Sequence, residues 1–323
     1  MAKTNVRYCA SMRPCIFASI NMKILIIKPS SFGDIVQALP CANALKLAYP
    51  DCEITWVVFK GWQDLISLCS DVDKIIVWDR KKGIKGFFEV LKTARQTEYD
   101  LIFDLQGLLR SALLAKFANG KNQIGVSGMK EFSGILIKEA YPENAKINAT
   151  LRNLKTISFI TKKEFPVNVN IKTESNSLMD GNYISLIPFA RGKGKDWNIE
   201  NYFKFIDLII KRLPGLKIAV LGSKSDYGKI NSDKIIDLCG KTDIKQLASV
   251  LAGSKAAVGA DTGPMHLSSV LQIPSVFIFG DSDINETSPY IGRFSLLINK
   301  DNPADINKVM PEEVFSEVEK WIK

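Results

Sequence analysis

The chain of 323 residues is 46% hydrophobic and 24% charged and contains 13 prolines, a composition that excludes disordered, collagen-like and coiled-coil proteins. Its length suits about two globular domains of ordinary size. The only histidine is His266, which excludes His-rich metal sites. Any His-dependent catalytic triad would have to be built around that one residue.

The six cysteines never form a Cys-x-x-Cys pair, so they read as free thiols in a reducing compartment such as the cytoplasm. The net charge of +9 is uneven: residues 22–163 carry 21 Lys and Arg against 14 Asp and Glu, whereas residues 164–323 carry 19 against 20. A basic first half indicates an anionic partner, which could be a nucleic acid, an acidic membrane surface or a phosphorylated substrate. Solvated surface lysines would explain the same charge equally well.

No apolar run approaches the roughly 18 residues of a membrane-spanning helix, which predicts a soluble or peripheral protein. Arg13 and Pro14 interrupt any apolar core near the start of the chain, which argues against a secretory signal. Met22 leads directly into an apolar strand. We therefore expect residues 1–21 to be a disordered N-terminal extension.

From Met22 onward, short apolar runs rich in β-branched residues alternate with longer helical segments, a pattern typical of parallel strands joined by crossover helices. The first half predicts strands at Ile24–Ile27, Glu53–Phe59, Lys74–Trp78 and Asp100–Asp104, a helix from Asp34 to before Pro50, and a basic helical segment around Lys81–Thr97. Residues 141–180 lose this regularity. A domain boundary is expected there, with a linker at about 166–180.

The second half restarts the same alternation. It predicts strands at Tyr183–Ile187, Lys217–Leu221, Ala256–Gly259 and Ser275–Phe279, and helices at Ile199–Arg212, Ile244–Leu251, Pro264–Leu271 and Glu312–Ile322. The predicted fold class is therefore α/β, with two doubly wound Rossmann-like domains over residues 22–165 and 181–323. Ligands of such sheets bind outside the carboxyl ends of the strands, so the cleft between the domains is the expected reaction site.

Two motifs of other enzyme classes were considered. Neither domain opens with Gly-x-Gly-x-x-Gly, which argues against a nicotinamide-dependent dehydrogenase. Asp281-Ser282-Asp283 has the Asp-x-Asp spacing of metal-dependent sugar transferases. It has no supporting ligands nearby in the sequence, so a polar loop is the favoured interpretation.

The first motif with chemical meaning is KPSSFGD at residues 28–34, directly after the first strand. A Ser/Gly turn at this point brings backbone amides to the end of the strand, and Gly33 permits close approach. Asp34 stands at the start of the next helix. The residue could simply cap that helix, but its position in the expected cleft favours a catalytic carboxylate.

The second motif is GADTGPMH at residues 259–266, between a strand and a helix. Pro264 suits the first helical position, and the free N–H groups around Thr262 and Met265 then form an anion site suited to a diphosphate. His266 falls in the first turn, where the helix dipole favours a neutral imidazole that donates to phosphate. A capped helix with a half-buried histidine is an equally good explanation of this motif alone.

The third motif is RGKGKDW at residues 191–197, after the first strand of the second half. A cation of this loop could neutralise a leaving diphosphate in place of a metal ion. Taken alone, the motif is more simply explained as a charged surface loop.

The three motifs, in this order and at these places, resemble glycosyltransferase family 9, the lipopolysaccharide heptosyltransferases. Further similarity runs through DLQGLLRS at residues 104–111, and the first motif is most similar to that of the heptosyltransferase I group. The resemblance covers the chain from about Met22 to its C-terminus. It implies a GT-B fold with an acceptor domain followed by a domain that binds ADP-heptose.

What the resemblance implies for single residues is an inverting, metal-independent transfer of heptose to the Kdo region of lipid A. Asp34 matches the general base and Lys195 the phosphate-contacting lysine. Asp261, Thr262, Gly263, Pro264 and His266 match the nucleotide-sugar loop, and Lys28, Ser30, Ser31 and Gly33 lie beside the acceptor's acidic sugars. The expected setting is the cytoplasmic face of the inner membrane, with an anionic glycolipid as partner and no nucleic acid.

The sequence departs from the family pattern at two places. Phe189-Ala190-Arg191 replaces hydroxyl residues that many relatives carry before the lysine loop, so phosphate contacts are expected from Arg191 or backbone amides. The acidic residue near the nucleoside falls loosely at Asp226. Alternatives are therefore a GT-B transferase for another nucleotide sugar or acceptor in cell-surface glycan synthesis and, from a different class, a basic nucleic-acid-binding protein, which lacks a matching motif.

Overall fold

A computed structural model describes residues 21–141, 146–175, 178–190, 194–226, 228–230 and 235–322. Residues 1–20 of the expected N-terminal extension lie outside the described residues, and so does Arg191. None of the described helices has the length and apolarity needed to cross a bilayer.

The first half is built on a six-stranded parallel sheet of order β3-β2-β1-β4-β5-β6. Its strands are β1 (Lys23–Ile27), β2 (Glu53–Phe59), β3 (Lys74–Trp78), β4 (Tyr99–Asp104), β5 (Gly120–Gly125) and β6 (Lys138–Glu139). Its helices are α1 (Phe32–Ala38), α2 (Pro40–Ala48), α3 (Gln63–Ser67), α4 (Gly83–Ala94), α5 (Leu109–Phe117) and α6 (Ala149–Thr161), with short 3-10 turns η1 (Arg80–Lys82) and η2 (Ser133–Ile135).

The second half has a six-stranded parallel sheet of order β12-β11-β10-β7-β8-β9. Its strands are β7 (Tyr183–Ile187), β8 (Lys217–Val220), β9 (Ile235–Asp237), β10 (Ala257–Ala260), β11 (Ser275–Phe279) and β12 (Phe294–Ile298). Its helices are α7 (Ile199–Arg212), α8 (Ile244–Gly253), α9 (Gly263–Val270), α10 (Ile284–Thr287) and α11 (Pro311–Ile322), with 3-10 turns η3 (Lys224–Asp226) and η4 (Ile306–Lys308). Taken from β9, this order repeats that of the first sheet, so the halves share one topology.

The predicted α/β class with two parallel sheets is confirmed. Strands β2, β7 and β11 have the predicted bounds because nearly every residue in them is buried, as expected when helices cover both faces of a parallel sheet. Strands β5, β6, β9 and β12, at or next to the sheet edges, were missed. They carry polar or partly exposed residues, which weakens the apolar signal on which the prediction depended.

Two helix predictions were wrong. The single helix expected between Asp34 and Pro50 is two helices, because α1 ends at Ala38 and Pro40 begins α2. The irregular stretch expected at 141–180 contains α6, which packs against α1 and α2 through buried residues such as Leu154 and Ile157. Beyond it, the expected linker runs along the first half, since Ile171 forms a β-bridge with Cys69.

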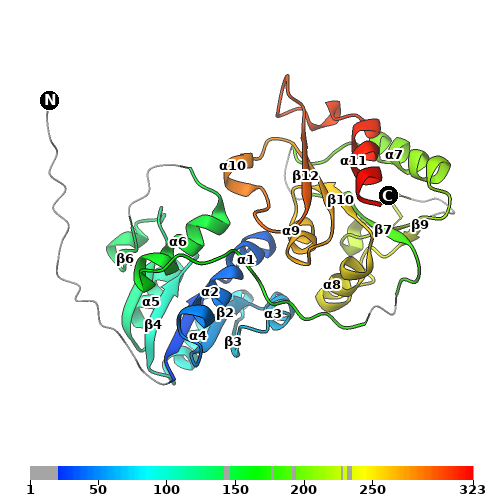
Figure 1. Ribbon diagram of the computed structural model, residues 1–323. Helices are drawn as coiled ribbons and strands as arrows, with labels where there is room; N and C mark the ends of the chain where they lie inside the picture. The colour runs from blue at the N-terminus through cyan, green and yellow to red at the C-terminus, as the bar shows by residue number, and fades with distance from the viewer. Residues whose placement is uncertain are drawn as a thin grey trace, which may run out of the picture.

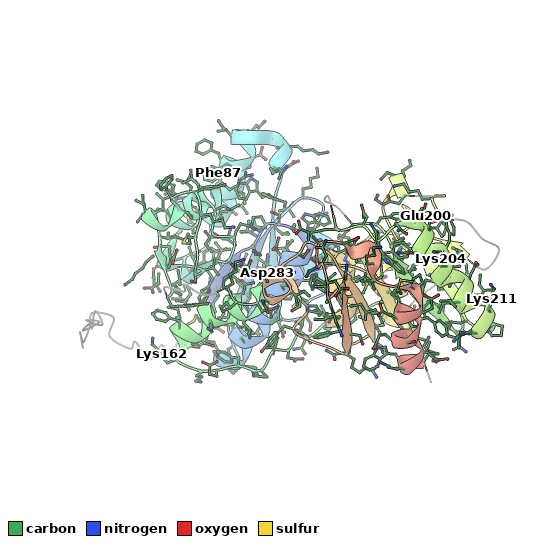
Figure 2. All side chains as sticks on the ribbon, turned by 90° about the horizontal axis from the view of Figure 1, so that it is seen from above. Phe87, Lys162, Glu200, Lys204, Lys211 and Asp283 are labelled. Carbon is green, nitrogen blue, oxygen red and sulfur yellow. The ribbon has the colours of Figure 1, made fainter. Side chains whose placement is uncertain are left out.

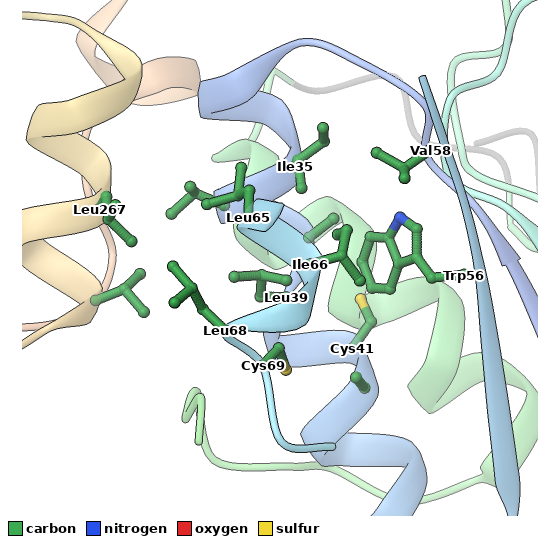
Figure 3. Packing of buried hydrophobic residues seen from close by; sticks show 14 of the residues in the cluster. Ile35, Leu39, Cys41, Trp56, Val58, Leu65, Ile66, Leu68, Cys69 and Leu267 are labelled. Atoms are coloured by element: carbon green, nitrogen blue, oxygen red, sulfur yellow. The ribbon is translucent and has the colours of Figure 1, made fainter. Parts of the chain in front are cut away.

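The two halves lie side by side and meet where α1 packs against α9 (Figure 1). One apolar core cluster contains residues of both halves, and Leu267 of α9 faces Leu65 and Leu68 of the first half (Figure 3). Two polar contacts join the same edge. The Gln37 side-chain amide donates to the Thr287 carbonyl at 3.1 Å, and that of Asn148 donates to the Ser288 carbonyl at 2.8 Å.

Candidate active site

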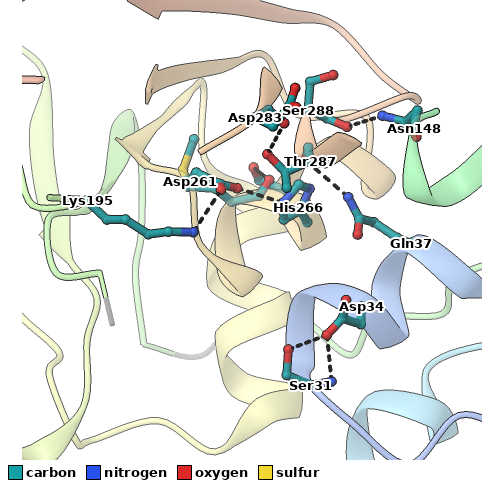
Figure 4. Close-up of polar contacts among 12 residues, drawn as sticks. Ser31, Asp34, Gln37, Asn148, Lys195, Asp261, His266, Asp283, Thr287 and Ser288 are labelled. Carbon is teal, nitrogen blue, oxygen red and sulfur yellow. Dashed lines mark hydrogen bonds and ion pairs between the residues drawn. The ribbon is translucent and has the colours of Figure 1, made fainter. Parts of the chain in front are cut away.

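The predicted site residues gather at the carboxyl ends of the central strands of both sheets. In each sheet the chain order reverses at this point, between β1 and β4 in the first and between β7 and β10 in the second. Such reversals are where doubly wound sheets bind their ligands. The α1–α9 contact brings the two reversal points together, as Figure 4 shows for Asp34, Asp261 and Lys195.

Asp34 is the third residue of α1, and Ser31 is the N-cap of that helix. The Asp34 Oδ2 atom accepts hydrogen bonds from the Ser31 amide at 2.9 Å and from the Ser31 hydroxyl at 2.6 Å. Burial alone would raise the pKa of Asp34, but Lys28, the Ser31 hydrogen bonds and His266 together hold it below its ordinary value. Asp34 is therefore ionised at neutral pH and is prepared to accept a proton.

Beneath Asp34 lie two buried ionisable groups, Lys28 and Asp104. The Lys28 ammonium is 5% exposed and donates to the Leu105 carbonyl at 2.9 Å, and burial lowers its pKa. Asp104 is fully buried and accepts from the Gln106 and Gly107 amides and the Ser111 hydroxyl. Its pKa is raised to about 6 by burial. The role of Lys28 beside the acceptor stays a prediction; in the structure its side chain is buried within the first half.

The rest of the KPSSFGD turn contacts the loop after β4 on one side and α9 of the second half on the other. The Ser30 amide donates to the Gln106 side chain at 3.3 Å, which fixes the turn against the loop after β4. Gly33 faces α9: a Cβ atom on it would lie 3.4 Å from the His266 ring and 3.6 Å from the Gly263 Cα atom. Ser31 is exposed, so it is the residue of this turn most open to a ligand.

On the facing side, Asp261 joins Lys195 and His266. Its Oδ1 atom lies 3.0 Å from His266 Nε2, and its Oδ2 atom lies 3.4 Å from the Lys195 ammonium (Figure 4). Burial alone would raise the pKa of Asp261, but His266 and Lys195 bring it below its ordinary value. An ionised carboxylate can only accept, so His266 Nε2 donates to Asp261. The predicted hydrogen bond from His266 to phosphate stays a prediction, and Nε2 already has a partner.

The N-terminus of α9 points its free N–H groups into the same space. The helix begins at Gly263, one residue before the predicted Pro264, and Thr262 is its N-cap. The Thr262 hydroxyl is buried and makes no hydrogen bond to any part of the chain that the structure describes. A buried hydroxyl without a partner is unfavourable, which marks this helix terminus as a place for a polar ligand.

The loop after β7 carries Lys195 to Asp261 across the sheet reversal. Asp196 accepts from the Ala190 amide at 2.8 Å, and the buried Trp197 indole donates to the Val309 carbonyl at 3.0 Å. These contacts hold Asp196 and Trp197, the residues that follow Lys195, and the Lys195 side chain, 33% exposed, is directed toward Asp261.

Two acidic positions have structural partners. Asp226 accepts from the Ser223 amide at 2.9 Å and pairs with the Lys229 ammonium at 2.7 Å, so its carboxylate is already engaged. Asp283 caps α10 by accepting from the Asn285 amide, and it pairs with Lys146 at 3.0 Å. Within the described ranges, no three His, Cys, Asp or Glu side chains are grouped as metal ligands.

Residues 87–314 match the sequence profile of glycosyltransferase family 9 (heptosyltransferase). The chain belongs to this family. It is therefore a glycosyltransferase, as the motifs indicated.

Curated relatives of this family 9 chain at 22–28% identity are named lipopolysaccharide heptosyltransferase 1, 2 or 3. One of them, lipopolysaccharide heptosyltransferase 1 of Campylobacter coli, is 28% identical over 86% of this chain and 88% of its own. The fold is similar to that of a family 9 glycosyltransferase from Veillonella parvula, with a TM-score of 0.82 at 18% identity over 94% of this chain and 98% of the other. Escherichia coli heptosyltransferase WaaC with ADP gives 0.76 at 20% identity over 93% and 100%.

The sequence alone did not reveal the residues beneath the KPSSFGD turn of this glycosyltransferase. Asp104 and Gln106 belong to DLQGLLRS at residues 104–111, whose similarity to the family assigns no role to either residue. The Gln106 side chain fixes the KPSSFGD turn through the Ser30 amide, and Asp104 in turn holds the loop of Gln106 through the Gln106 and Gly107 amides. The available signal was that Asp104 ends a buried strand beside β1, at the reversal of strand order.

Proposed function

We propose that this glycosyltransferase moves heptose from ADP-heptose to the Kdo region of lipid A with inversion at the anomeric carbon, as the heptosyltransferase I of lipopolysaccharide core synthesis. In this proposal the chain has a GT-B fold. Residues 22–165 bind the acceptor, residues 181–323 bind the nucleotide sugar, and residues 166–180 link them. The observation that carries it is the start of α1, with Asp34, packed against the N-terminus of α9, whose Asp261 loop is joined to Lys195 (Figure 4).

Asp34 acts as the general base. The acceptor hydroxyl oxygen attacks the anomeric carbon of heptose while its proton passes to the Oδ1 atom of Asp34, because Oδ2 is held by Ser31 and no described residue bonds to Oδ1. Attack from the face opposite the leaving group inverts the anomeric configuration. Asp34 is ionised at neutral pH, as a base must be before each turnover, and its lowered pKa makes it a weaker base than an ordinary carboxylate.

The second half stabilises the leaving group. As the bond between the anomeric carbon and the phosphate oxygen breaks, negative charge develops on ADP. Lys195, the Thr262 hydroxyl and the first N–H groups of α9 supply positive charge and hydrogen bonds at that point. Asp261, oriented by His266, accepts hydrogen bonds from the heptose hydroxyls. Arg191 and Asp226 are assigned to the nucleotide by the family resemblance alone.

The acceptor side uses Ser30, Ser31 and Gly33 of the turn. Lys28 contributes from below: its buried ammonium attracts the acceptor's carboxylates and keeps Asp34 ionised, although its Nζ atom is bonded to Leu105. The basic excess of the first half suits a glycolipid with acidic sugars and phosphates at the cytoplasmic face of the inner membrane.

A donor and acceptor screen tests the proposal. Purified enzyme would be incubated with ADP-heptose, UDP-glucose or GDP-mannose, and with Kdo-lipid A or a heptosylated Kdo-lipid A as acceptor. We expect transfer only from ADP-heptose to Kdo-lipid A, and NMR of the product should show an anomeric configuration opposite to that of the donor. Transfer only to the heptosylated acceptor would contradict the first-heptose assignment, and transfer from another nucleotide sugar would contradict the donor.

Metal independence has its own test. Because Lys195 and the N-terminus of α9 supply positive charge at the leaving group, EDTA should leave the transfer rate nearly unchanged. A strict requirement for a divalent cation would contradict this and return attention to Asp281-Ser282-Asp283.

A further inference from the structure

The first half carries large apolar side chains that no part of the described structure covers. Ile84 and Phe88 of α4 are 77% and 61% exposed, and Phe132 and Ile135 beside η2 are 85% and 82% exposed. Each pair follows the carboxyl end of a strand of the first sheet, β3 for α4 and β5 for η2. Large apolar side chains gathered in this way on a protein surface usually mark an interaction site.

The apolar side chains belong to one continuous surface. Helices α4 and α5 contact each other, and α5 contacts η2. At the N-terminus of α5, the Leu109 amide donates to the Glu131 carboxylate at 3.1 Å, which brings the half-exposed Leu109 beside Phe132. Phe87, the inner neighbour of Phe88, packs against the core beneath, as do Met129 and Leu136.

The same surface is strongly basic. Its exposed cations are Arg80, Lys81 and Lys82 of η1, Lys85 of α4, Arg110 on α5 and Lys130 before η2. Lys82 pairs with Glu89 at 2.8 Å. Among the residues that the structure describes, Lys81, Lys85, Arg110 and Lys130 form no ion pair, so their charge is available to a partner.

We infer that this apolar-basic surface, formed by the start of α4, the start of α5 and η2, docks on an anionic lipid bilayer. The inference rests on the proposed function, in which the acceptor is a lipid. Protruding Ile and Phe side chains enter the interface between headgroups and acyl chains, and the surrounding Lys and Arg side chains pair with lipid phosphates. The surface lies at the same strand edge as Asp34, so a sugar headgroup anchored in the bilayer would meet the base.

The test is sedimentation of the full chain with vesicles, without donor or acceptor. Vesicles of phosphatidylethanolamine with phosphatidylglycerol are compared with neutral phosphatidylcholine vesicles. We expect binding to the anionic vesicles only. The double variant Lys81→Gln/Lys85→Gln should bind about 30-fold more weakly, since each basic residue near an anionic surface contributes about a fivefold factor. Ile84→Ser/Phe88→Ser and Phe132→Ser/Ile135→Ser should each lose at least tenfold (an order-of-magnitude estimate).

Matched controls lie on α7 in the second half, where Phe203 is 40% exposed beside exposed Lys204, and where Lys211 is also exposed (Figure 2). Phe203→Ser and Lys204→Gln/Lys211→Gln should bind vesicles like the wild type. Equal loss in these controls, or wild-type binding by all three surface variants, would overturn the inference. The inference would also be overturned if Ile84→Ser/Phe88→Ser bound vesicles like the wild type and changed only from dimer to monomer.

The two proposals fail separately. On a deacylated, water-soluble Kdo acceptor the surface variants should keep the wild-type kcat/KM, while on acceptor in vesicles they should lose activity in proportion to binding. If no Kdo acceptor is glycosylated but vesicle binding still depends on these side chains, the proposed acceptor is wrong and the surface assignment stands.

Discussion

The strand order reverses in the same way in both sheets, at β1 and β4 in the first half and at β7 and β10 in the second. The charged groups at these two points differ in burial and in the length of the loop that carries them. In the first half the charged groups beneath the turn are buried, with Lys28 5% and Asp104 0% exposed, and the turn between β1 and α1 spans only residues 28–31. In the second half Lys195 reaches the site from a longer loop and its side chain is 33% exposed. The short turn after β1, packed on buried charged groups, holds the Asp34 carboxylate rigidly. The longer loop after β7 instead brings the Lys195 ammonium to a ligand at the end of β10.

The largest expected effect is that of Asp34→Asn. The amide cannot take the proton of the acceptor, so kcat should fall by about 10²–10⁴-fold. Calorimetry with ADP should give nearly the wild-type Kd, because the donor contacts lie in the other half. A wild-type turnover rate would show that Asp34 is not the base.

Lys195→Ala, unlike Asp34→Asn, should weaken donor binding as well as turnover. Loss of one charge-stabilising donor should lower kcat by about 10²–10³-fold, and ADP should bind more weakly. The matched control is Lys204→Ala on α7, an exposed lysine far from Asp261, which should leave both quantities unchanged. If Lys195→Ala kept the ADP affinity of the wild type, the assignment of Lys195 to the diphosphate would be wrong.

Asp104→Asn tests the buried carboxyl of Asp104 through the pH dependence of stability. In the folded state the pKa of Asp104 is raised from 3.8 to about 6, so between these values the folded protein holds a proton that the unfolded chain has lost. The contribution of Asp104 to the free energy of unfolding therefore decreases as pH rises through this window.

The asparagine does not titrate, so the difference in free energy of unfolding between wild type and variant should change by up to about 3 kcal/mol from pH 4 to pH 7. Urea denaturation at both pH values measures it. Parallel pH curves for the two proteins would contradict a buried, titrating Asp104.

Gly263→Ala probes the contact between the halves. A Cβ atom at this position would lie 2.6–2.9 Å from the Phe32 side chain, so α1 and α9 would have to separate. We expect a loss of about 1–3 kcal/mol in the free energy of unfolding. The paired control is Gly33→Ala on α1, where the nearest atom is 3.4 Å away and alanine favours a helix. Equal stability of the two variants would mean that the α1–α9 contact is not tightly packed.

Ser31→Ala should have the smallest effect. It removes the hydroxyl hydrogen bond to Asp34, which raises the pKa of Asp34 toward its ordinary range and moves the acid limb of kcat/KM to higher pH. The stability that ionised Asp34 contributes above its unfolded-state pKa, and loses as pH falls through its folded-state pKa, should shrink by about 1 kcal/mol. If the acid limb of kcat/KM stayed at the wild-type pH, that limb would not report the ionisation of Asp34.

Much of the site could be predicted because its residues follow buried strands. Asp34 and the Asp261 loop come directly after apolar runs that can only be strands, so their place at a sheet edge follows from the pattern. The partners of His266 could not be predicted in this way. Whether its Nε2 atom meets a phosphate or Asp261 depends on a rotation about side-chain bonds that the spacing of residues does not fix.

The family, the parallel α/β class and the order of the chemical motifs were determined by the sequence itself, because motif spacing and strand burial are local properties of the chain. Tertiary structure alone decided that the Lys28 ammonium bonds to the Leu105 carbonyl, that Lys195 meets Asp261 66 positions away, and that α1 packs on α9. Each depends on which elements become neighbours when two sheets of the same topology bury a shared apolar core.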